Sequence, residues 1–131
     1  MVAAALHAGF QLTVTVVVYP ALARTPAAVW PQAHAAHCRR TGAVVALVYG
    51  TLLAAWVRVL LAGELPGSWV AAVGSLLTVA TTATVAAPTH TRLGREGPRP
   101  DLLRRLLRAD RVRLLGAGLT LGGALAVAVT R

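Results

Sequence analysis

Residues 68–87 of the chain have the sequence SWVAAVGSLLTVATTATVAA, and the fold class can be predicted from this run. It contains no charged side chain, and its length meets the roughly 20 apolar residues that a helix needs to cross the hydrocarbon core of a bilayer. Because a backbone surrounded by lipid must satisfy its own hydrogen bonds, we predict a transmembrane helix here. Similar apolar runs occupy residues 2–23, 41–62 and 114–129. The sequence therefore predicts an all-α, integral membrane four-helix bundle, multi-pass in the cell membrane, with a single domain over residues 1–131.

The chain is basic, yet the distribution of its charge indicates lipid rather than nucleic acid. The net charge is +9, all thirteen basic residues are arginines, and 56% of the residues are hydrophobic. That hydrophobic share is too large for an ordinary soluble domain. The arginines cluster beside the apolar runs, where arginine contacts lipid head groups, and no aromatic residues alternate with them as in a nucleic-acid platform. We therefore expect the lipid bilayer as a partner and no nucleic acid.

The arginines also predict how the helices are oriented, because arginine-rich connections face the cytoplasm. Residues 24–40 hold three arginines, residues 88–113 hold eight, and the turn at residues 63–67 holds Glu64 and no arginine. The first and third connections are thus arginine-rich cytoplasmic loops, and both termini lie outside (N-out/C-out). The first run also resembles a signal peptide, but no arginine precedes it, so we interpret it as an uncleaved membrane helix.

Prolines mark the expected ends of several helices. Pro20 kinks or ends the first helix, Pro31 suits the first turn of the second, and the third ends before Pro88. A second helix that begins near Pro31 is longer than the hydrocarbon is thick, so its first turns project into the cytoplasmic interface. Asp101 is expected to cap an amphipathic cytoplasmic helix, residues 102–110, before helix four. Its leucines alternate with arginines in a pattern that suits an anionic leaflet.

Polar side chains within the apolar runs recur at helical spacing, so they share helix faces. The stripes on the first and third helices consist of His7, Gln11, Thr15, Tyr19, Ser75, Thr78 and Thr82. Such groups either line a polar cavity or form hydrogen bonds between helices, and for the threonines we favour hydrogen bonds. Gly118 and Gly122 form a small-xxx-small pair, which permits close contact within the chain or, in a homo-oligomer, between copies.

The polar residues expected at the cytoplasmic end of the bundle form the predicted site. His34 and His37 are three residues apart on the projecting start of the second helix, and His90 follows the third helix. Asp110 and Arg113 open the fourth helix at a similar depth. We predict catalytic roles for His34, His37, His90 and Arg113, and substrate contacts for Tyr19, Trp30, Arg40 and Asp110.

The same residues leave the cofactor open. His34, His37 and His90 are candidate ligands of a transition metal such as zinc, iron or copper, and two of them can ligate a haem. A polar pocket without any cofactor is another alternative. In a third alternative the histidines are ordinary residues at the membrane–water interface, and Asp110 pairs with a neighbouring arginine. Cys38 has no cysteine partner in the chain, and we interpret it as a half-buried structural thiol.

These motifs, in this order, resemble the anthrone-oxygenase-like family of small four-helix membrane proteins. The motifs that carry the resemblance are Tyr19-Pro20, Trp30, His34, His37, residues 88–93 (PTHTRL) and residues 111–113 (RVR). Some members of that family oxidise anthrones, which are polycyclic aromatic compounds, to quinones. The resemblance therefore implies an oxygenase or other tailoring enzyme that acts on a lipophilic, polycyclic aromatic small molecule.

These observations are compatible with an enzyme, a non-catalytic membrane subunit or a haem-binding bundle. In an enzyme, His34 or His37 removes the acidic proton between the rings of an anthrone. Arg113 or Arg40 stabilises the enolate, His90 and Tyr19 position the substrate, and the carbanion reacts with oxygen without a metal. Alternatively, the chain is a non-catalytic membrane subunit, or a haem-binding bundle in which His34 or His37 faces His90. We disfavour a channel or transporter, because no helix carries a carboxylate at the centre of the membrane.

Overall fold

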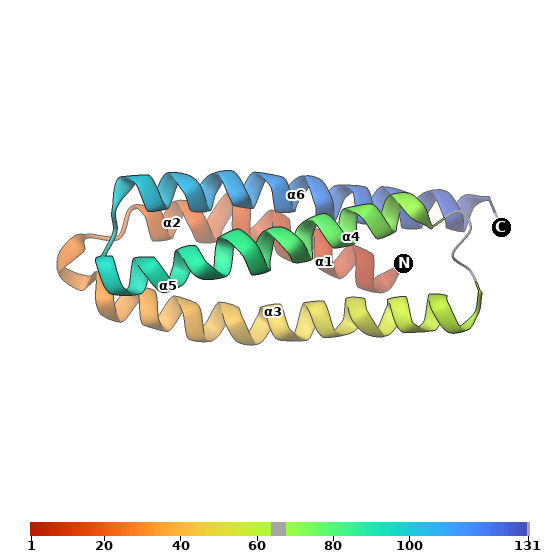
Figure 1. Ribbon diagram of the computed structural model, residues 1–131, viewed down its shortest axis with the longest axis horizontal. Coiled ribbons are helices and arrows are strands. Elements are labelled where there is room, and N and C mark those ends of the chain that lie inside the picture. The colour runs from red at the N-terminus through yellow and green to blue at the C-terminus, as the bar shows by residue number, and fades with distance from the viewer. Residues whose placement is uncertain (64–67, 131) are drawn as a thin grey trace.

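The computed structural model describes residues 1–63 and 68–130. Within them the chain forms four long helical segments that run up and down side by side, and no strand (Figure 1). All four segments are long and apolar enough to cross a membrane, which confirms the prediction of an all-α chain with four apolar helices. The predicted turn at residues 63–67, with Glu64, falls on residues 64–67 and so lies outside the described residues apart from Gly63.

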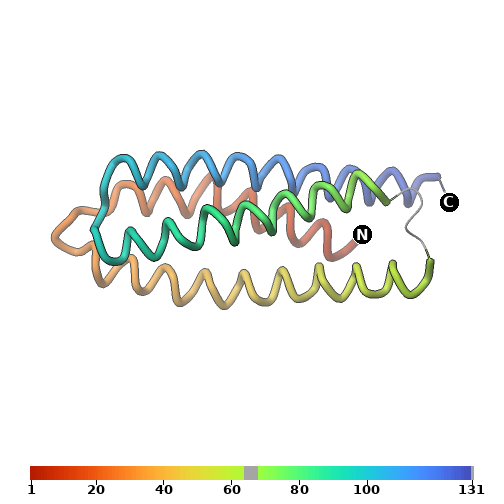
Figure 2. Tube along the Cα trace, in the orientation of Figure 1, coloured from red at the N-terminus to blue at the C-terminus, as the bar shows by residue number. Residues whose placement is uncertain are grey.

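The segments are built from six α-helices and three short turns of other helical types. In chain order they are α1 (Val2–Thr13), a π-helical turn (Val14–Val18), α2 (Tyr19–Ala23), a 3-10 turn (Ala27–Val29), α3 (Trp30–Leu61), α4 (Trp69–Thr81), a second π-helical turn (Thr82–Ala86), α5 (Ala87–Glu96) and α6 (Pro100–Val129). The start of α1 and the end of α6 lie at the end of the molecule opposite the first and third connections (Figure 2).

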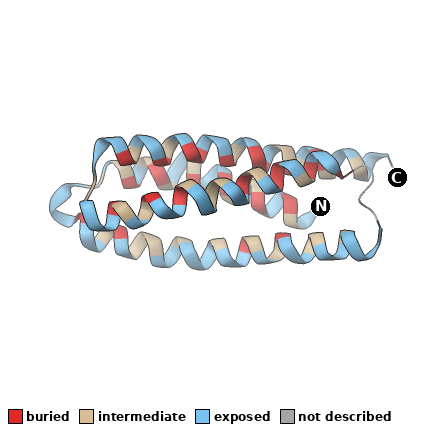
Figure 3. Cartoon of the chain, viewed as in Figure 1, coloured by how far each residue is buried: buried red, intermediate tan, exposed pale blue. Residues whose placement is uncertain are grey.

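The second segment is the least buried of the four. Its most apolar window is 11% buried, whereas the corresponding windows of the other three segments are 28% buried. Figure 3 shows the buried residues of the other helices where α1, α4 and α6 face one another, while α3 is exposed along most of its length. The core of the molecule therefore lies among the first, third and fourth segments, and α3 closes one side.

A π-helical turn precedes the proline in both the first and the third segment. Proline lacks an N–H, and its ring clashes with the carbonyl four residues earlier. In these wider turns a backbone N–H bonds to the carbonyl five residues earlier. The N–H of Tyr19 bonds to the carbonyl of Val14, and the N–H of Ala87 bonds to the carbonyl of Thr82. The helix therefore continues past the proline in each case. The prediction that the third helix ends before Pro88 is wrong, because α5 continues to Glu96.

The fourth segment is one continuous helix. The predicted separate amphipathic helix at residues 102–110 forms the first turns of α6, because its leucines continue the stripe that faces the core. Leu102 and Leu106 are 2% and 1% exposed and belong to the main apolar cluster. The predicted cap at Asp101 is also wrong. Arg99 is the N-cap residue, and Asp101 lies in the first turn, where it forms an ion pair with Arg99 at 3.1 Å.

Glycines bring the backbones of α4 and α6 into contact. A Cβ atom added to Gly74 would lie 2.5 Å from the carbonyl oxygen of Gly116, and one added to Gly123 would lie 2.5 Å from the nitrogen of Ala71. A Cβ atom added to Gly118 or to Gly122 would have no neighbour within 4 Å among the described residues. The prediction that the Gly118/Gly122 pair packs within the chain is therefore wrong. The alternative, that the pair makes contact between copies of the chain, stays a prediction.

Candidate functional site

All four segments bring polar side chains together at one end of the molecule, which we name the histidine end. It is formed by α2, the first turns of α3, α5 and the first half of α6, and it lies at the left in Figure 1. Tyr19 comes from α2, His34 from α3, His90 from α5 and Arg113 from α6. Because α5 continues past the proline at its second position, His90 is held by a packed helix and not by a loop.

A chain of short polar contacts links these four residues. Nη1 of Arg113 donates a hydrogen bond of 3.3 Å to the hydroxyl oxygen of Tyr19. That oxygen lies 3.2 Å from Nε2 of His90, whose Nδ1 lies 3.3 Å from Nε2 of His34. A guanidinium, a phenol and two imidazoles thus follow one another within hydrogen-bond distance, which connects a fixed positive charge to groups that exchange protons.

Arg113 is buried and is held by partners on two sides. Its Nε and Nη2 atoms donate hydrogen bonds of 3.2 and 3.0 Å to the Oε1 atom of Gln11. Gln11 in turn donates a hydrogen bond of 2.7 Å from Nε2 to Asp110, whose carboxylate lies 3.7 Å from Nη2 of Arg113. The side chains of Arg113 and Asp110 are 5% and 2% exposed. A buried charge persists only when it is paired and hydrogen-bonded, and this network meets both conditions.

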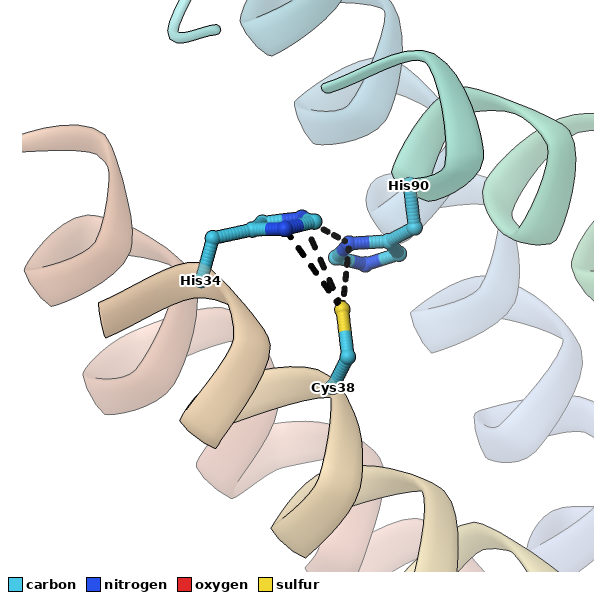
Figure 4. A group of neighbouring side chains, drawn as sticks. All are labelled: His34, Cys38 and His90. Atoms are coloured by element: carbon cyan, nitrogen blue, oxygen red, sulfur yellow. Dashed lines mark hydrogen bonds between the residues drawn. The ribbon is translucent and has the colours of Figure 1, made fainter. Parts of the chain in front are cut away.

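A thiol completes the group around His34. Cys38 lies one helical turn after His34, and its Sγ atom is 3.5 Å from Nε2 of His34 and 3.8 Å from Nδ1 of His90 (Figure 4). The Trp30 ring stacks on the His34 ring with centroids 5.1 Å apart, and its indole N–H bonds to the carbonyl of Leu93 at 3.1 Å. The stacked indole ring of Trp30 therefore limits the movement of the His34 ring.

A cavity of about 350 Å³ opens beside these groups, between α3 and α5. Its walls combine polar groups with small apolar ones, and the lining includes Tyr19, His37, Cys38, His90, Arg113, Gly42, Val45, Ala86 and Ala87. Nδ1 of His37 lies 3.3 Å from the hydroxyl of Thr41, whereas its Nε2 is buried without a hydrogen-bond partner among the described residues. His37 therefore lines the cavity with one ring nitrogen that has no hydrogen-bond partner among the described residues.

The structure brings most of the predicted site residues together. His34, His37 and His90 have ring centroids within 6.4 Å of one another, and Tyr19 and Arg113 are joined to His90 as described above. Three residues predicted to contact substrate are not among the residues that line the cavity. Trp30 is 2% exposed and packs in the core, Asp110 is paired with Gln11 and Arg113, and Arg40 is exposed without a side-chain hydrogen bond or ion pair to any described residue.

Two residues of the site were not predicted as part of it. Cys38 lies beside the two histidines and is not only a structural thiol, as its spacing of four residues from His34 on one helix face allows. Gln11 forms hydrogen bonds between helices, which is one of the two interpretations given above for its stripe. His7, on the same stripe, is fully buried and has no hydrogen-bond partner for either ring nitrogen among the described residues; its ring contacts that of Tyr49 edge to face.

The polar stripe of the third segment forms hydrogen bonds, as favoured from the sequence. Thr78 donates to the carbonyl of Arg113 at 3.3 Å, and the hydroxyls of Ser75 and Thr120 lie 3.2 Å apart. The hydroxyl of Thr82 lies 2.8 Å from that of Tyr49 on α3. These bonds join α4 to α6, and they join the π-helical turn after α4 to α3. Thr82 also lines the cavity between α3 and α5.

The geometry does not fit a haem between two histidines. Such a haem would need its porphyrin plane between the two axial imidazoles. The rings of His34 and His90 stack with centroids 5.5 Å apart, and those of His37 and His90 stack at 5.3 Å. Neither stacked pair has this arrangement, and the haem-binding alternative stays a prediction.

Comparison of the chain with protein-family models, with curated proteins and with solved structures finds no match. The resemblance to the anthrone-oxygenase-like family therefore stays a prediction from the motifs quoted above.

Replacing Asp110 tests the buried network. We expect Asp110→Ala to destabilise the fold by about 3–5 kcal/mol, because Arg113 would keep its buried charge without its partner. Asp101→Ala is the matched control, since it removes a carboxylate from an exposed ion pair, which contributes little to stability. Unfolding of the protein in mixed micelles with increasing dodecyl sulfate measures both. If the two variants unfolded at the same dodecyl sulfate concentration, Asp110 would not be the partner that stabilises the buried charge of Arg113.

Proposed function

We propose that this chain is a multi-pass cell-membrane protein with both termini outside and the histidine end at the cytoplasmic face. The support is the outer surface of the bundle, where large apolar side chains are exposed along the helices, among them Val16, Leu47, Leu53 and Leu76. Exposed apolar surface on this scale requires an apolar partner, and lipid is the one that surrounds four such helices on all sides. Eleven of the thirteen arginines, all except Arg58 and Arg131, lie in residues 24–40 and 88–113, which form the histidine end, as the positive-inside rule predicts of a cytoplasmic face.

Labelling of single cysteines tests this orientation. In a Cys38→Ser background, we expect Thr130→Cys to react with a membrane-impermeant maleimide in intact cells, because the end of α6 is outside. Ala28→Cys, in the first connection, should react only after the membrane is permeabilised. The reverse pattern would place the histidine end outside, and labelling of both in intact cells would rule out a four-span topology.

We further propose that the protein is an oxygenase-like tailoring enzyme for a lipophilic, polycyclic aromatic substrate. The observation that carries the proposal is the cavity at the histidine end. Its walls join small apolar side chains to an imidazole, a phenol and a guanidinium, which is the composition that holds a greasy molecule and acts on one polar group of it. A substrate dissolved in the bilayer would reach this cavity between α3 and α5.

The residues of the cavity divide into a base and a group that stabilises an oxyanion. His37 is the base in this scheme, because its Nε2 has no partner among the described residues while that of His34 already lies against His90. Arg113 and the Tyr19 hydroxyl stabilise the enolate that forms when a proton leaves an acidic ring carbon. The carbanion then reacts with dioxygen, and the balance is one methylene and one O₂ converted to one carbonyl and one water. His90 positions Tyr19, and the exposed Arg40 takes no part.

Oxygen uptake with an anthrone in lipid nanodiscs tests this activity. We expect the protein to raise the rate above that of empty nanodiscs, and His37→Asn to lower kcat/KM by about 10²–10⁴-fold through loss of the base. Gln32→Ala is the control, because Gln32 is exposed on the same helix. A rate no higher than that of empty nanodiscs, or a His37→Asn variant as active as the wild type, would refute the proposal.

We propose in addition that copies of the chain associate through Gly118 and Gly122. Both are exposed on α6, and the open space beside their Cα atoms allows another helix to approach closely. The chemistry of the histidine end does not depend on this association.

Leucine substitutions on α6 separate association from folding. We expect Gly118→Leu to abolish cross-linked dimers in membranes without changing the stability of the monomer. Gly116→Leu should destabilise the monomer by about 1–3 kcal/mol or more, because its side chain would overlap Gly74 and Thr78. Dimers that persist in the Gly118→Leu variant would refute the proposed interface.

A further inference from the structure

We propose that His34, Cys38 and His90 bind one transition-metal ion of the zinc or copper type. The three residues come from α3 and α5 and meet beside the cavity at the histidine end (Figure 4). One donor atom from each residue lies within 4.8 Å of the donor atoms of the other two. The inference is independent of the proposed oxygenation, which requires no metal.

The separations of the donor atoms match those around a single ion. Nε2 of His34 and Nδ1 of His90 are 3.3 Å apart, and Sγ of Cys38 lies 3.5 and 3.8 Å from them. Metal–nitrogen bonds of about 2.0 Å and a metal–sulfur bond of about 2.3 Å at tetrahedral angles give separations of about 3.3 Å between nitrogens and about 3.5 Å between nitrogen and sulfur. The trio is thus already spaced for an ion, without movement of either helix.

The donor set selects the kind of ion. A thiolate with two imidazoles favours zinc and copper, whereas magnesium and calcium require oxygen ligands, and none of the three residues supplies one. On binding, the thiol of Cys38 loses its proton, and the resulting thiolate offsets part of the charge of the ion. The site therefore discriminates by chemistry as well as by spacing.

The surroundings hold two of the ligands as metal sites require. A metal-bound histidine usually donates its other ring N–H to a fixed partner, which sets its tautomer. With an ion on Nδ1 of His90, its Nε2 carries the proton and donates to the oxygen of Tyr19, which lies 3.2 Å away and is itself held by Arg113. The stacked ring of Trp30 limits the movement of His34.

Binding of an ion requires the two imidazole rings to rotate, and it leaves one coordination position of the ion without a protein ligand. The planes of the His34 and His90 rings are 30° apart, and the sulfur lies to one side of both rings in Figure 4. Binding therefore turns the imidazoles about their side-chain bonds so that the nitrogen lone pairs point to the ion. Cys38 and His90 line the cavity, so the fourth coordination position faces it and is available to water or another small ligand.

Cobalt substitution tests the site in the wild-type protein. Co²⁺ is added to metal-free, reduced protein in detergent. We expect one ion per chain, visible d–d bands of a tetrahedral site and a near-ultraviolet sulfur-to-cobalt charge-transfer band. Zn²⁺ added afterwards should displace the cobalt and remove the bands. Absence of the charge-transfer band in correctly folded protein would overturn the proposal, and because no turnover is measured, this failure is distinct from failure of the proposed enzyme activity.

Variants then assign the ligands. We expect Cys38→Ser, His34→Asn and His90→Asn each to weaken Zn²⁺ binding by more than about tenfold, measured as Kd by competition with a chromophoric chelator. Cys38→Ser should also eliminate the charge-transfer band. Thr41→Val is the control, since Thr41 lines the same cavity without belonging to the trio. Unchanged Kd values in folded Cys38→Ser or His90→Asn, checked by circular dichroism, would assign the ion to other residues and refute the site.

Discussion

The buried guanidinium of Arg113 is the constraint around which the histidine end is organised. A charge in an apolar interior is stable only when it is paired and hydrogen-bonded. The structure supplies Gln11 from α1, Asp110 from the preceding turn of α6 and Tyr19 from α2. These bonds fix the rotation of the first segment against the fourth. The same bonds place the Tyr19 hydroxyl where it meets His90, so the requirement to satisfy one arginine also positions the groups proposed for chemistry.

The two π-helical turns make this arrangement compatible with proline. Each turn widens the helix just before Pro20 or Pro88, and the chain continues as an α-helix beyond. Without that continuation, His90 would lie on a loop and Leu93 would not reach the core, where it accepts the hydrogen bond of the Trp30 indole. π-Helical turns are often found at functional sites, and here they flank the candidate site on two helices.

Much of the architecture and part of the site could be predicted from the sequence. The number of long helices could be predicted from local hydropathy, because each apolar run is long enough for one membrane-spanning helix and the structure forms a helix over each run. The grouping of His34, His37 and His90 could be predicted too, since each lies near the same end of its helix. The position of Arg40 could not be predicted, because it depends on the rotation of α3 about its axis. In the structure His34 and Cys38 face inward and Arg40 is exposed. The burial of Trp30 could not be predicted either, because it depends on contact with Leu93, 63 residues away in the chain.

The four apolar spans, the clustering of most arginines in two connections and the polar stripes along the helices depend on composition and helical period, so they can be predicted from the amino-acid sequence alone. Three features emerge only when the helices pack: Pro88 lies within a helix, Cys38 joins two histidines, and Gly116 rather than Gly118 meets α4. Periodicity says which residues share a face but not which neighbour that face meets. That choice depends on close packing of small residues and on satisfying buried polar groups between segments distant in the chain.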